Sequence, residues 1–244
     1  MYPVLNVGPA ALQLPGLILL LGFWLSLNLA GRRAKAEGLP EEVIFNAGMI
    51  ALLAGLVGAR LGYVALHWSA YQNDLSGIMA LTTGALSTPA GLLIGGGVAV
   101  LYLRLHQLPA PTLLDVLAPA LALMFAFISL ADVSAGSAYG TVSDLPWAIE
   151  LWGARRHPTQ VYELLAALAT LGLLWWARSR RPYAGFLFLL FLLTYGAARL
   201  FLDAFRADAW LLAGGYRTAQ VIGLGAVVLA LWRMGQQATQ SSQT

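Results

Sequence analysis

Long apolar runs separated by short polar breaks dominate this chain of 244 residues. Seven runs are long enough to cross about 30 Å of hydrocarbon as α-helices, which rise by about 1.5 Å per residue. We expect these helices over residues 11–31, 43–66, 88–106, 112–131, 158–177, 183–206 and 218–234. The pattern predicts an all-α, polytopic membrane protein with seven transmembrane helices in a single domain over residues 1–235.

Basic residues are distributed unequally between the two sides of these helices. Because positive charge is favoured on the cytoplasmic side, the richer side predicts an external N-terminus, an internal C-terminus and a disordered cytoplasmic tail over residues 236–244. The richer side carries Arg32, Arg33, Lys35, Arg104, Arg178, Arg180, Arg181 and Arg233, and the other side carries Arg155, Arg156, Arg206 and Arg217.

Composition narrows the class of protein. With 59% hydrophobic and 10% charged residues, the chain has too little polar surface for a soluble globule. The absence of cysteine excludes disulfides, thiolate metal sites and a cysteine nucleophile. The net charge of +3 reflects loop orientation, so no nucleic-acid partner is expected. No residues show metal-ligand spacing, and no cofactor or metal is expected.

The most informative polar segment is HPTQVYE at residues 157–163, which precedes an apolar run ending at Trp176. Pro158 is suited to the first turn of a helix because its missing N–H is not needed there. Gln160 and Glu163 are three residues apart and therefore share one helix face.

Charged residues from several helices are expected at one depth, in the outer half of the membrane. Each intramembrane charge costs about 2.5–3.5 kcal/mol on insertion scales, so such a group must pair or perform chemistry. Two arginines and a tyrosine on one stripe of the sixth helix could hold a phospholipid head group. The alternative is a structural network of ion pairs with arginines extending outward. The residues at this depth are Arg60, Asp132, His157, Glu163, Arg199, Asp203 and Arg206, and Tyr195 begins the stripe.

Other polar residues allow different interpretations. Asp115 is expected near the inner face, capping the short turn after Pro111. Ser134, Ser137 and His157 suggest an intramembrane Ser/His hydrolase, although neither serine lies in a recognised nucleophile turn. A transporter would need broken helices in corresponding halves, and the sequence shows no such pair.

Several motifs together resemble the bacterial prolipoprotein diacylglyceryl transferases. HPTQ followed by a tyrosine and a glutamate is the most specific of them. The others are GARLGY at 58–63, GLLIGG at 91–96, LDVLAPALAL at 114–123, AGSAYG at 135–140, DLPW at 144–147, YGAARLFLDAFR at 195–206 and AQVIGL at 219–224.

The resemblance implies a multi-pass protein of the bacterial plasma (inner) membrane that matures lipoproteins. It would transfer the diacylglyceryl group of phosphatidylglycerol to the lipobox cysteine of a preprolipoprotein and release glycerol phosphate. Its partners would be phosphatidylglycerol, the preprolipoprotein lipobox peptide and membrane lipid. The implied catalytic residues are His157, as the base, with Arg199 and Glu163. Lipid or phosphate binding is implied for Arg60, Tyr195, Arg206, Asp203, Gln160, Tyr162, Asp132 and Gly140.

Several positions depart from the family pattern, among them Asp132 in place of an asparagine or cysteine and Asp203 in place of a glutamate. Ser129 replaces an arginine, Ala90 replaces a histidine or tyrosine, and Ser137 replaces a glutamate. One hypothesis is an active transferase in which Arg155 or Arg156 supplies the missing charge. The other is a catalytically impaired member that binds phospholipid or lipoprotein as a partner or regulator.

Overall fold

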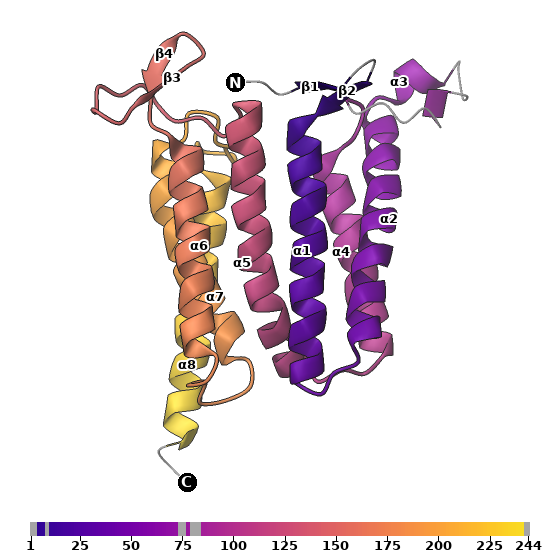
Figure 1. The fold of residues 1–244 in the computed structure, drawn as a ribbon, viewed down its shortest axis with the longest axis vertical. Helices are drawn as coiled ribbons and strands as arrows, with labels where there is room; N and C mark the ends of the chain where they lie inside the picture. Colours follow the sequence, from indigo (N-terminus) through magenta and orange to yellow (C-terminus); the bar gives the residue numbers. More distant parts are fainter. Residues whose placement is uncertain (1–3, 8–9, 73–76, 79–83, 242–244) are drawn as a thin grey trace. The chain divides into compact units, whose positions relative to one another are not determined.

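Apolar helices make up most of the structure, a computed structural model that describes residues 4–7, 10–72, 77–78 and 84–241. Seven helices in this part of the chain are long and apolar enough to cross a membrane, which confirms the predicted fold class (Figure 1). The predicted orientation of the termini stays a prediction. The helices are α1 (Leu14–Ala36), α2 (Glu41–Leu66), α3 (Trp68–Tyr71), α4 (Thr88–Leu105), α5 (Ala110–Ala135), α6 (Thr159–Ala177), α7 (Phe186–Leu202), the 3-10 helix η2 (Asp203–Phe205) and α8 (Thr218–Ser241).

Among the described residues, two short antiparallel hairpins accompany the helices, and the apolar pattern did not predict them. β1 (Val4–Val7) pairs with β2 (Ala10–Gln13), and β3 (Ile149–Leu151) pairs with β4 (Ala154–Arg156). The first hairpin explains why α1 begins at Leu14, since the preceding residues form a strand.

Several helices extend beyond the predicted apolar runs. α1 continues to Ala36 through basic residues, and α8 continues to Ser241, so the structure differs from the predicted disordered tail over residues 236–241. Residues 242–244 lie outside the described residues. Hydropathy marks the part of a helix that hydrocarbon surrounds, whereas Ala, Arg, Lys and Gln favour helix in water as well.

The chain divides into two compact units. The α5–α8 unit comprises Met1–Leu29 and Ala110–Thr244, and the α2–α4 unit comprises Ala30–Pro109, so α1 contributes to both. The prediction of a single domain over residues 1–235 stays a prediction.

In the α2–α4 unit, α2 and α4 approach closely through glycines. A Cβ atom added at Gly91 would lie 2.9 Å from the carbonyl oxygen of Gly55, and one added at Gly95 would lie 3.0 Å from the Gly55 Cα. Small residues of this kind allow helix backbones to pack closely in a membrane.

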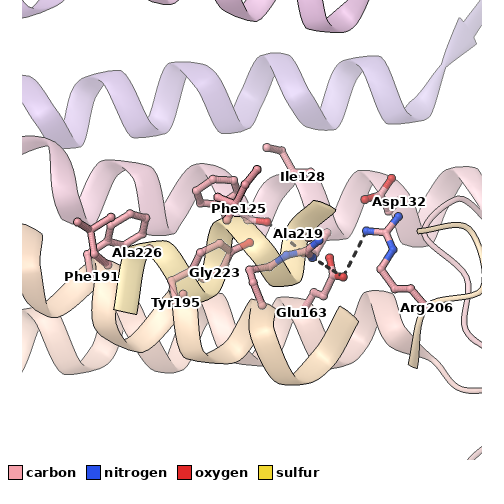
Figure 2. Close-up of a pocket in the computed structure, with 15 residues that line it drawn as sticks. Phe125, Ile128, Asp132, Glu163, Phe191, Tyr195, Arg206, Ala219, Gly223 and Ala226 are labelled. Atoms are coloured by element: carbon pink, nitrogen blue, oxygen red, sulfur yellow. Dashed lines mark hydrogen bonds and ion pairs between the residues drawn. The ribbon is translucent and has the colours of Figure 1, made fainter. Parts of the chain in front are cut away.

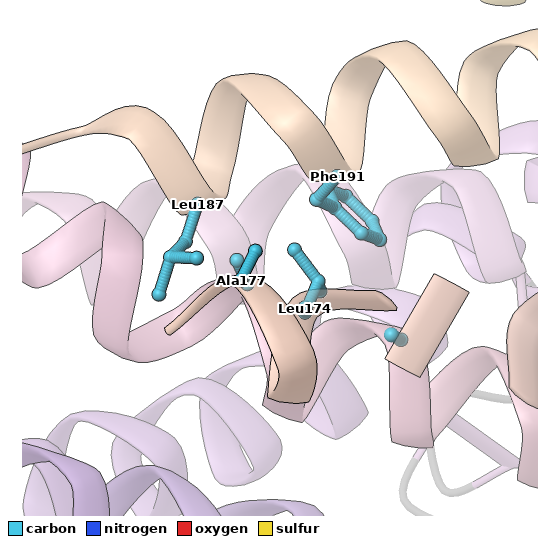
Figure 3. Close-up of a cluster of buried hydrophobic side chains, with 6 residues drawn as sticks. Leu174, Ala177, Leu187 and Phe191 are labelled. Atoms are coloured by element: carbon cyan, nitrogen blue, oxygen red, sulfur yellow. The ribbon is translucent and has the colours of Figure 1, made fainter. Parts of the chain in front are cut away.

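In the α5–α8 unit, a buried apolar cluster joins α5, α6 and α7 (Figure 3). α8 packs against α7, where Gly196 and Gly223 face each other's backbone carbonyls. The ends of α5 and α7 and the beginnings of α6 and α8 therefore share one end of this unit, near β3 and β4 (Figure 1). The cluster consists of Ala118, Ala122, Leu174, Ala177, Leu187 and Phe191.

Asp115 caps a different helix from the one predicted. Its fully buried carboxylate accepts hydrogen bonds from the backbone N–H groups of Gly185 (2.8 Å) and Phe188 (3.0 Å), at the start of α7. Arg181 approaches it at 3.9 Å. The expected cap on the turn after Pro111 is wrong because the N–H groups that need an acceptor are those that begin α7.

We predict that Asp115→Ala lowers the free energy of unfolding by about 1–2 kcal/mol, the usual effect of losing a helix cap. Asp115→Asn should lower the free energy of unfolding by less, because one side-chain carbonyl oxygen remains as an acceptor. Thermal unfolding in detergent, followed by circular dichroism, measures both. Asp144→Ala, at an exposed position, serves as the control, and an Asp115→Ala midpoint equal to that of this control would contradict the capping role.

Candidate functional site

The first turn of α6 holds the loop that follows α5. The Thr159 hydroxyl donates to the carbonyl of Ala138 (2.6 Å), and the Gln160 side-chain amide donates to the carbonyl of Ser137 (2.7 Å). Both α6 side chains are almost fully buried. The Ser137 hydroxyl in turn donates to Asp132 (2.6 Å), which lies in the last turns of α5. The HPTQ motif therefore fixes the path of the chain from α5.

The segment 139–143 then runs between two parts of the chain that carry predicted site residues. On one side, the backbone N–H of His157 donates to the carbonyl of Thr141 (3.0 Å). On the other side, the N–H of Thr141 donates to the carbonyl of Phe205 (2.8 Å). This central segment thus sets the positions of the His157 and Arg206 backbones.

Gly140 is the point of closest approach in this segment. It bridges Arg206 on one side, and a Cβ atom added to it would collide with the backbone and Cβ of His157 on the other. A side chain at this position would therefore have to separate the two neighbouring chains.

Glu163 joins two arginines into one charged cluster. Its Oε1 atom lies 2.5 Å from Nη1 of Arg199 and 3.4 Å from Nη1 of Arg206, and the residue is only 4% exposed. Asp203 approaches Arg199 at 3.4 Å, and Asp208 approaches Arg206 at 3.0 Å. These ion pairs compensate the charges of the cluster, and a buried charge is tolerated when it is paired.

This cluster forms one end of a pocket of about 380 Å³. Figure 2 shows Asp132 and Arg206 toward one end of the pocket, and Phe191 and Ala226 toward the other. The apolar part contains stacked rings, with Tyr195 centred 4.5 Å from Phe125 and 5.7 Å from Phe191. The lining residues are Phe125, Ile128, Ser129, Asp132, Glu163, Phe191, Leu192, Tyr195, Gly196, Arg199, Arg206, Ala219, Ile222, Gly223 and Ala226.

The pocket brings together part of the predicted site. Asp132, Glu163, Tyr195, Arg199 and Arg206 all contribute to its lining. The remaining predicted residues of this unit make contacts beside it, and their binding or catalytic roles stay predictions. They are Gly140, His157, Gln160, Tyr162 and Asp203.

A neighbouring residue, Phe205, connects His157 to the charged end of this pocket. Its ring is centred 5.1 Å from that of Phe205, the residue before Arg206. Its Nδ1 atom is 3.5 Å from the Tyr162 hydroxyl, which accepts a hydrogen bond from the Trp147 indole (2.7 Å). The histidine as a whole is partly exposed.

Arg60 belongs to the α2–α4 unit and is buried there. Its guanidinium donates to the backbone carbonyls of Gly77 (2.6 Å), Ile78 (2.9 Å) and Ala85 (3.0 Å). The prediction that Arg60 binds a lipid phosphate therefore competes with a structural role in holding these segments. Ala90, in the same unit, lies against Gly62.

The arginines suggested as replacements at position 129 are bonded to loop backbone. Arg156 donates to the carbonyls of Leu151 (3.1 Å) and Gly140 (3.3 Å), and Arg155 donates to that of Leu145 (3.1 Å). Neither belongs to the lining of the pocket. These contacts do not support the hypothesis that Arg155 or Arg156 supplies the charge that is missing at position 129.

The serines contradict the hydrolase hypothesis. The Ser134 hydroxyl donates to the carbonyl of Ala131 (2.7 Å), and the Ser137 hydroxyl donates to Asp132. Within the described ranges, neither hydroxyl forms a hydrogen bond with His157. In the part of the chain that the structure describes, neither Ser134 nor Ser137 is therefore a nucleophile activated by this histidine.

Two residues that support the site, Asp208 and Arg217, were not predicted from the sequence. Asp208 pairs with Arg206, and Arg217 donates from Nη1 to the carbonyls of Asp203 (2.6 Å) and Arg206 (2.8 Å). Asp208 could have been found, since it lies two residues from Arg206. No sequence pattern indicated the role of Arg217, because its contacts depend on the tertiary path of the loop before α8.

Comparison with known proteins identifies the family. A family model described as prolipoprotein diacylglyceryl transferase matches residues 3–235. The chain belongs to the prolipoprotein diacylglyceryl transferase family. This confirms the resemblance inferred from the sequence motifs, and the match includes every residue that lines the pocket.

Individual relatives of the transferase family match over most of their length. Phosphatidylglycerol–prolipoprotein diacylglyceryl transferase of Geobacillus kaustophilus is 33% identical, over 93% of this chain and 90% of the relative. The protein of the same name from Finegoldia magna is 30% identical, over 87% of this chain and 86% of the relative. The protein of the same name from Parasynechococcus marenigrum is 29% identical, over 98% of this chain and 95% of the relative. The similarity therefore covers both units of the chain.

We predict that Gly140→Ala lowers the free energy of unfolding by about 1–3 kcal/mol, because overpacking must push the central segment away from His157. Gly172→Ala is the matched control, since a Cβ atom there meets no neighbour within 4 Å and alanine favours helix. Thermal unfolding of the two variants in detergent compares them. Equal stability of both variants would contradict the close packing at Gly140.

Proposed function

We propose that this protein transfers the diacylglyceryl group of phosphatidylglycerol to the lipobox cysteine of a preprolipoprotein in the bacterial plasma membrane. The observation that supports this most directly is a pocket with two guanidiniums at one end and stacked aromatic rings at the other. A phospholipid has the same polarity, with a phosphate above its apolar chains. Family membership supports the reaction type, since the relatives carry the name of this activity.

In the proposed complex, Arg199 and Arg206 bind the phosphate of phosphatidylglycerol. Charge-assisted hydrogen bonds from guanidinium to phosphate are about twice as strong as neutral ones. Glu163 holds both guanidiniums in place before the lipid arrives, which reduces the side-chain ordering that binding requires. The glycerol and the first parts of the acyl chains then extend toward Phe125 and Phe191.

The proposed chemical step is a displacement at carbon. The cysteine sulfur attacks the glycerol carbon that carries the phosphate, a C–S bond forms and the C–O bond breaks. Glycerol phosphate leaves with the bonding electron pair, and Arg199 and Arg206 stabilise the charge that develops on it. His157 accepts the proton of the thiol, because a neutral imidazole is a suitable base near neutral pH.

His157 is oriented for this role by its own contacts. The Tyr162 hydroxyl lies beside Nδ1, and Trp147 fixes that hydroxyl in turn. Phe205 packs against the ring, so the imidazole and the Arg206 backbone are held near each other. The arrangement supports a reaction in which the thiol and the phosphate meet at the charged end of the pocket.

Ser129 supports a second candidate function, a catalytically impaired member that binds phospholipid or lipoprotein as a partner or regulator. It lines the pocket, is almost fully buried and donates its hydroxyl to the Phe125 carbonyl (3.1 Å). The pocket's two guanidiniums are already paired with carboxylates, and a serine adds no cation. Phosphate charge would then be stabilised enough for binding and too little for reaction.

Mass spectrometry of a lipobox peptide incubated with the purified protein and phosphatidylglycerol separates these two functions. The proposed activity predicts a peptide heavier by one diacylglyceryl group, and the reaction should be lost in His157→Ala. An unmodified peptide, with phosphatidylglycerol still bound, would favour the binding function. In that case Ser129→Arg, alone or with Ala90→His, should create turnover.

We predict that Arg199→Ala and Glu163→Ala each weaken phosphatidylglycerol binding at least about tenfold, or about 1.4 kcal/mol. The first removes a phosphate donor, and the second releases both guanidiniums from their positions. Binding to detergent-solubilised protein can be measured with a fluorescent lipid analogue. Asp115→Ala is the control because its carboxylate caps α7 away from the pocket, and an equal loss in all three variants would contradict the proposed cradle.

A further inference from the structure

A second cavity, of about 330 Å³, lies at the beginning of α8. It shares no lining residue with the pocket that contains Glu163, so the two are separate sites on the α7–α8 pair. We call it the Arg217 groove. Its main lining residues are Leu200 of α7, Tyr216 and Arg217 of the preceding loop, and Gln220, Val221 and Leu224 of α8.

An ordered turn holds the polar end of the Arg217 groove. The backbone N–H of Leu212 donates to the carbonyl of Tyr216 (2.8 Å), and that of Gly215 donates to the carbonyl of Leu212 (3.0 Å). Gly214 and Gly215 have φ values of 90° and 80°, which glycine adopts without strain. The turn therefore presents Tyr216 and Arg217 in a fixed place.

Arg217 carries a charge that the described residues do not neutralise. Its Nη1 donates to two backbone carbonyls, those of Asp203 and Arg206, and no carboxylate in the described part of the chain lies within 4 Å. A guanidinium has five N–H donors, and those on Nε and Nη2 have no acceptor among the described residues. Arg199 and Arg206 differ, since carboxylates pair with both.

The rest of the Arg217 groove is apolar and faces outward. Val221 is 47% exposed and Leu224 is 52% exposed, and Leu200 completes this wall. Leu224 lies six residues into α8, about 9 Å from its start along the helix axis. In a membrane this wall is at the depth of acyl chains, whereas Arg217 is at the level where the span ends.

We propose that the Arg217 groove binds a phospholipid, distinct from the one in the pocket, with its phosphate on Arg217 and an acyl chain along Val221 and Leu224. Charge complementarity favours a phosphate, and the apolar wall favours a lipid over a free anion. The inference depends only on the membrane location of α7 and α8, and not on the proposed transfer reaction. Since Arg217 also holds the carbonyl of Arg206, the bound lipid stabilises the backbone that carries a pocket arginine.

Native mass spectrometry of the full chain, titrated with phosphatidylglycerol in detergent, tests this site without requiring turnover. Arg217→Gln removes the phosphate donor. Leu224→Trp fills the apolar part and leaves the hydrogen bonds of Arg217 unchanged, so it separates lipid binding from a purely structural role. Arg233→Gln is the control, because this arginine is exposed and stacks on Trp232.

The wild type and the control should retain one more phospholipid than either groove variant, and affinity for that lipid should fall at least about tenfold in each variant. Equal lipid retention in all proteins, or a loss confined to one groove variant, would overturn the proposal. A parallel titration uses inorganic phosphate. Phosphate that displaces the additional lipid at equal concentration would show a free-anion site and overturn the assignment to lipid.

Discussion

The shared carboxylate oxygen of Glu163 is the contact on which the arrangement of the pocket depends. Two arginines placed close together at the end of a membrane helix repel each other and would extend toward water if left alone. Glu163, on the adjacent helix, holds Arg199 and Arg206 together through one atom. Removing one partner from such a buried cluster costs about 3–5 kcal/mol, because the remaining charges lose their compensation. The cluster therefore connects the stability of the α6–α7 pair to the chemistry of the site.

Around this cluster, main-chain hydrogen bonds fix the positions of the neighbouring chain segments. The segment 139–143 contacts His157 on one side and Phe205 on the other, and Gly140 allows both chains to approach. Backbone contacts of this kind tolerate many side chains while fixing distances between the elements they join. They allow a short loop to place residues that are far apart in the sequence within one site.

The sequence predicted the helices and much of the pocket because both follow from rules of spacing. Apolar length located the seven helices, and the repeat of Tyr195, Arg199 and Arg206 located one wall of the pocket. The depth in the membrane that the sequence predicts did not distinguish binding residues from structural residues at the same depth. The side chain of Gln160, for which the family resemblance implies lipid binding, donates to a loop carbonyl, a contact that helical spacing does not indicate.

Features that depend on the tertiary path of loops could not be predicted. The partner of Asp115 is an N–H group 70 residues away, and the carbonyls bound by Arg217 come from a turn between two spans. The hairpin of β3 and β4 was hidden in a loop, since strands of three residues leave no clear alternation. Short-range patterns identify such residues as polar and do not indicate their partners.

The packing of α8 has a consequence for how a lipid could reach the pocket. α8 contacts the unit mainly through α7 and η2, and the buried apolar cluster contains no residue of α8. The pocket wall formed by Ala219, Ile222 and Ala226 therefore belongs to a helix outside that cluster. A bulky, two-tailed reactant that passes this wall would therefore disturb contacts of α8 with α7 and η2, and would leave the folded centre of the unit intact.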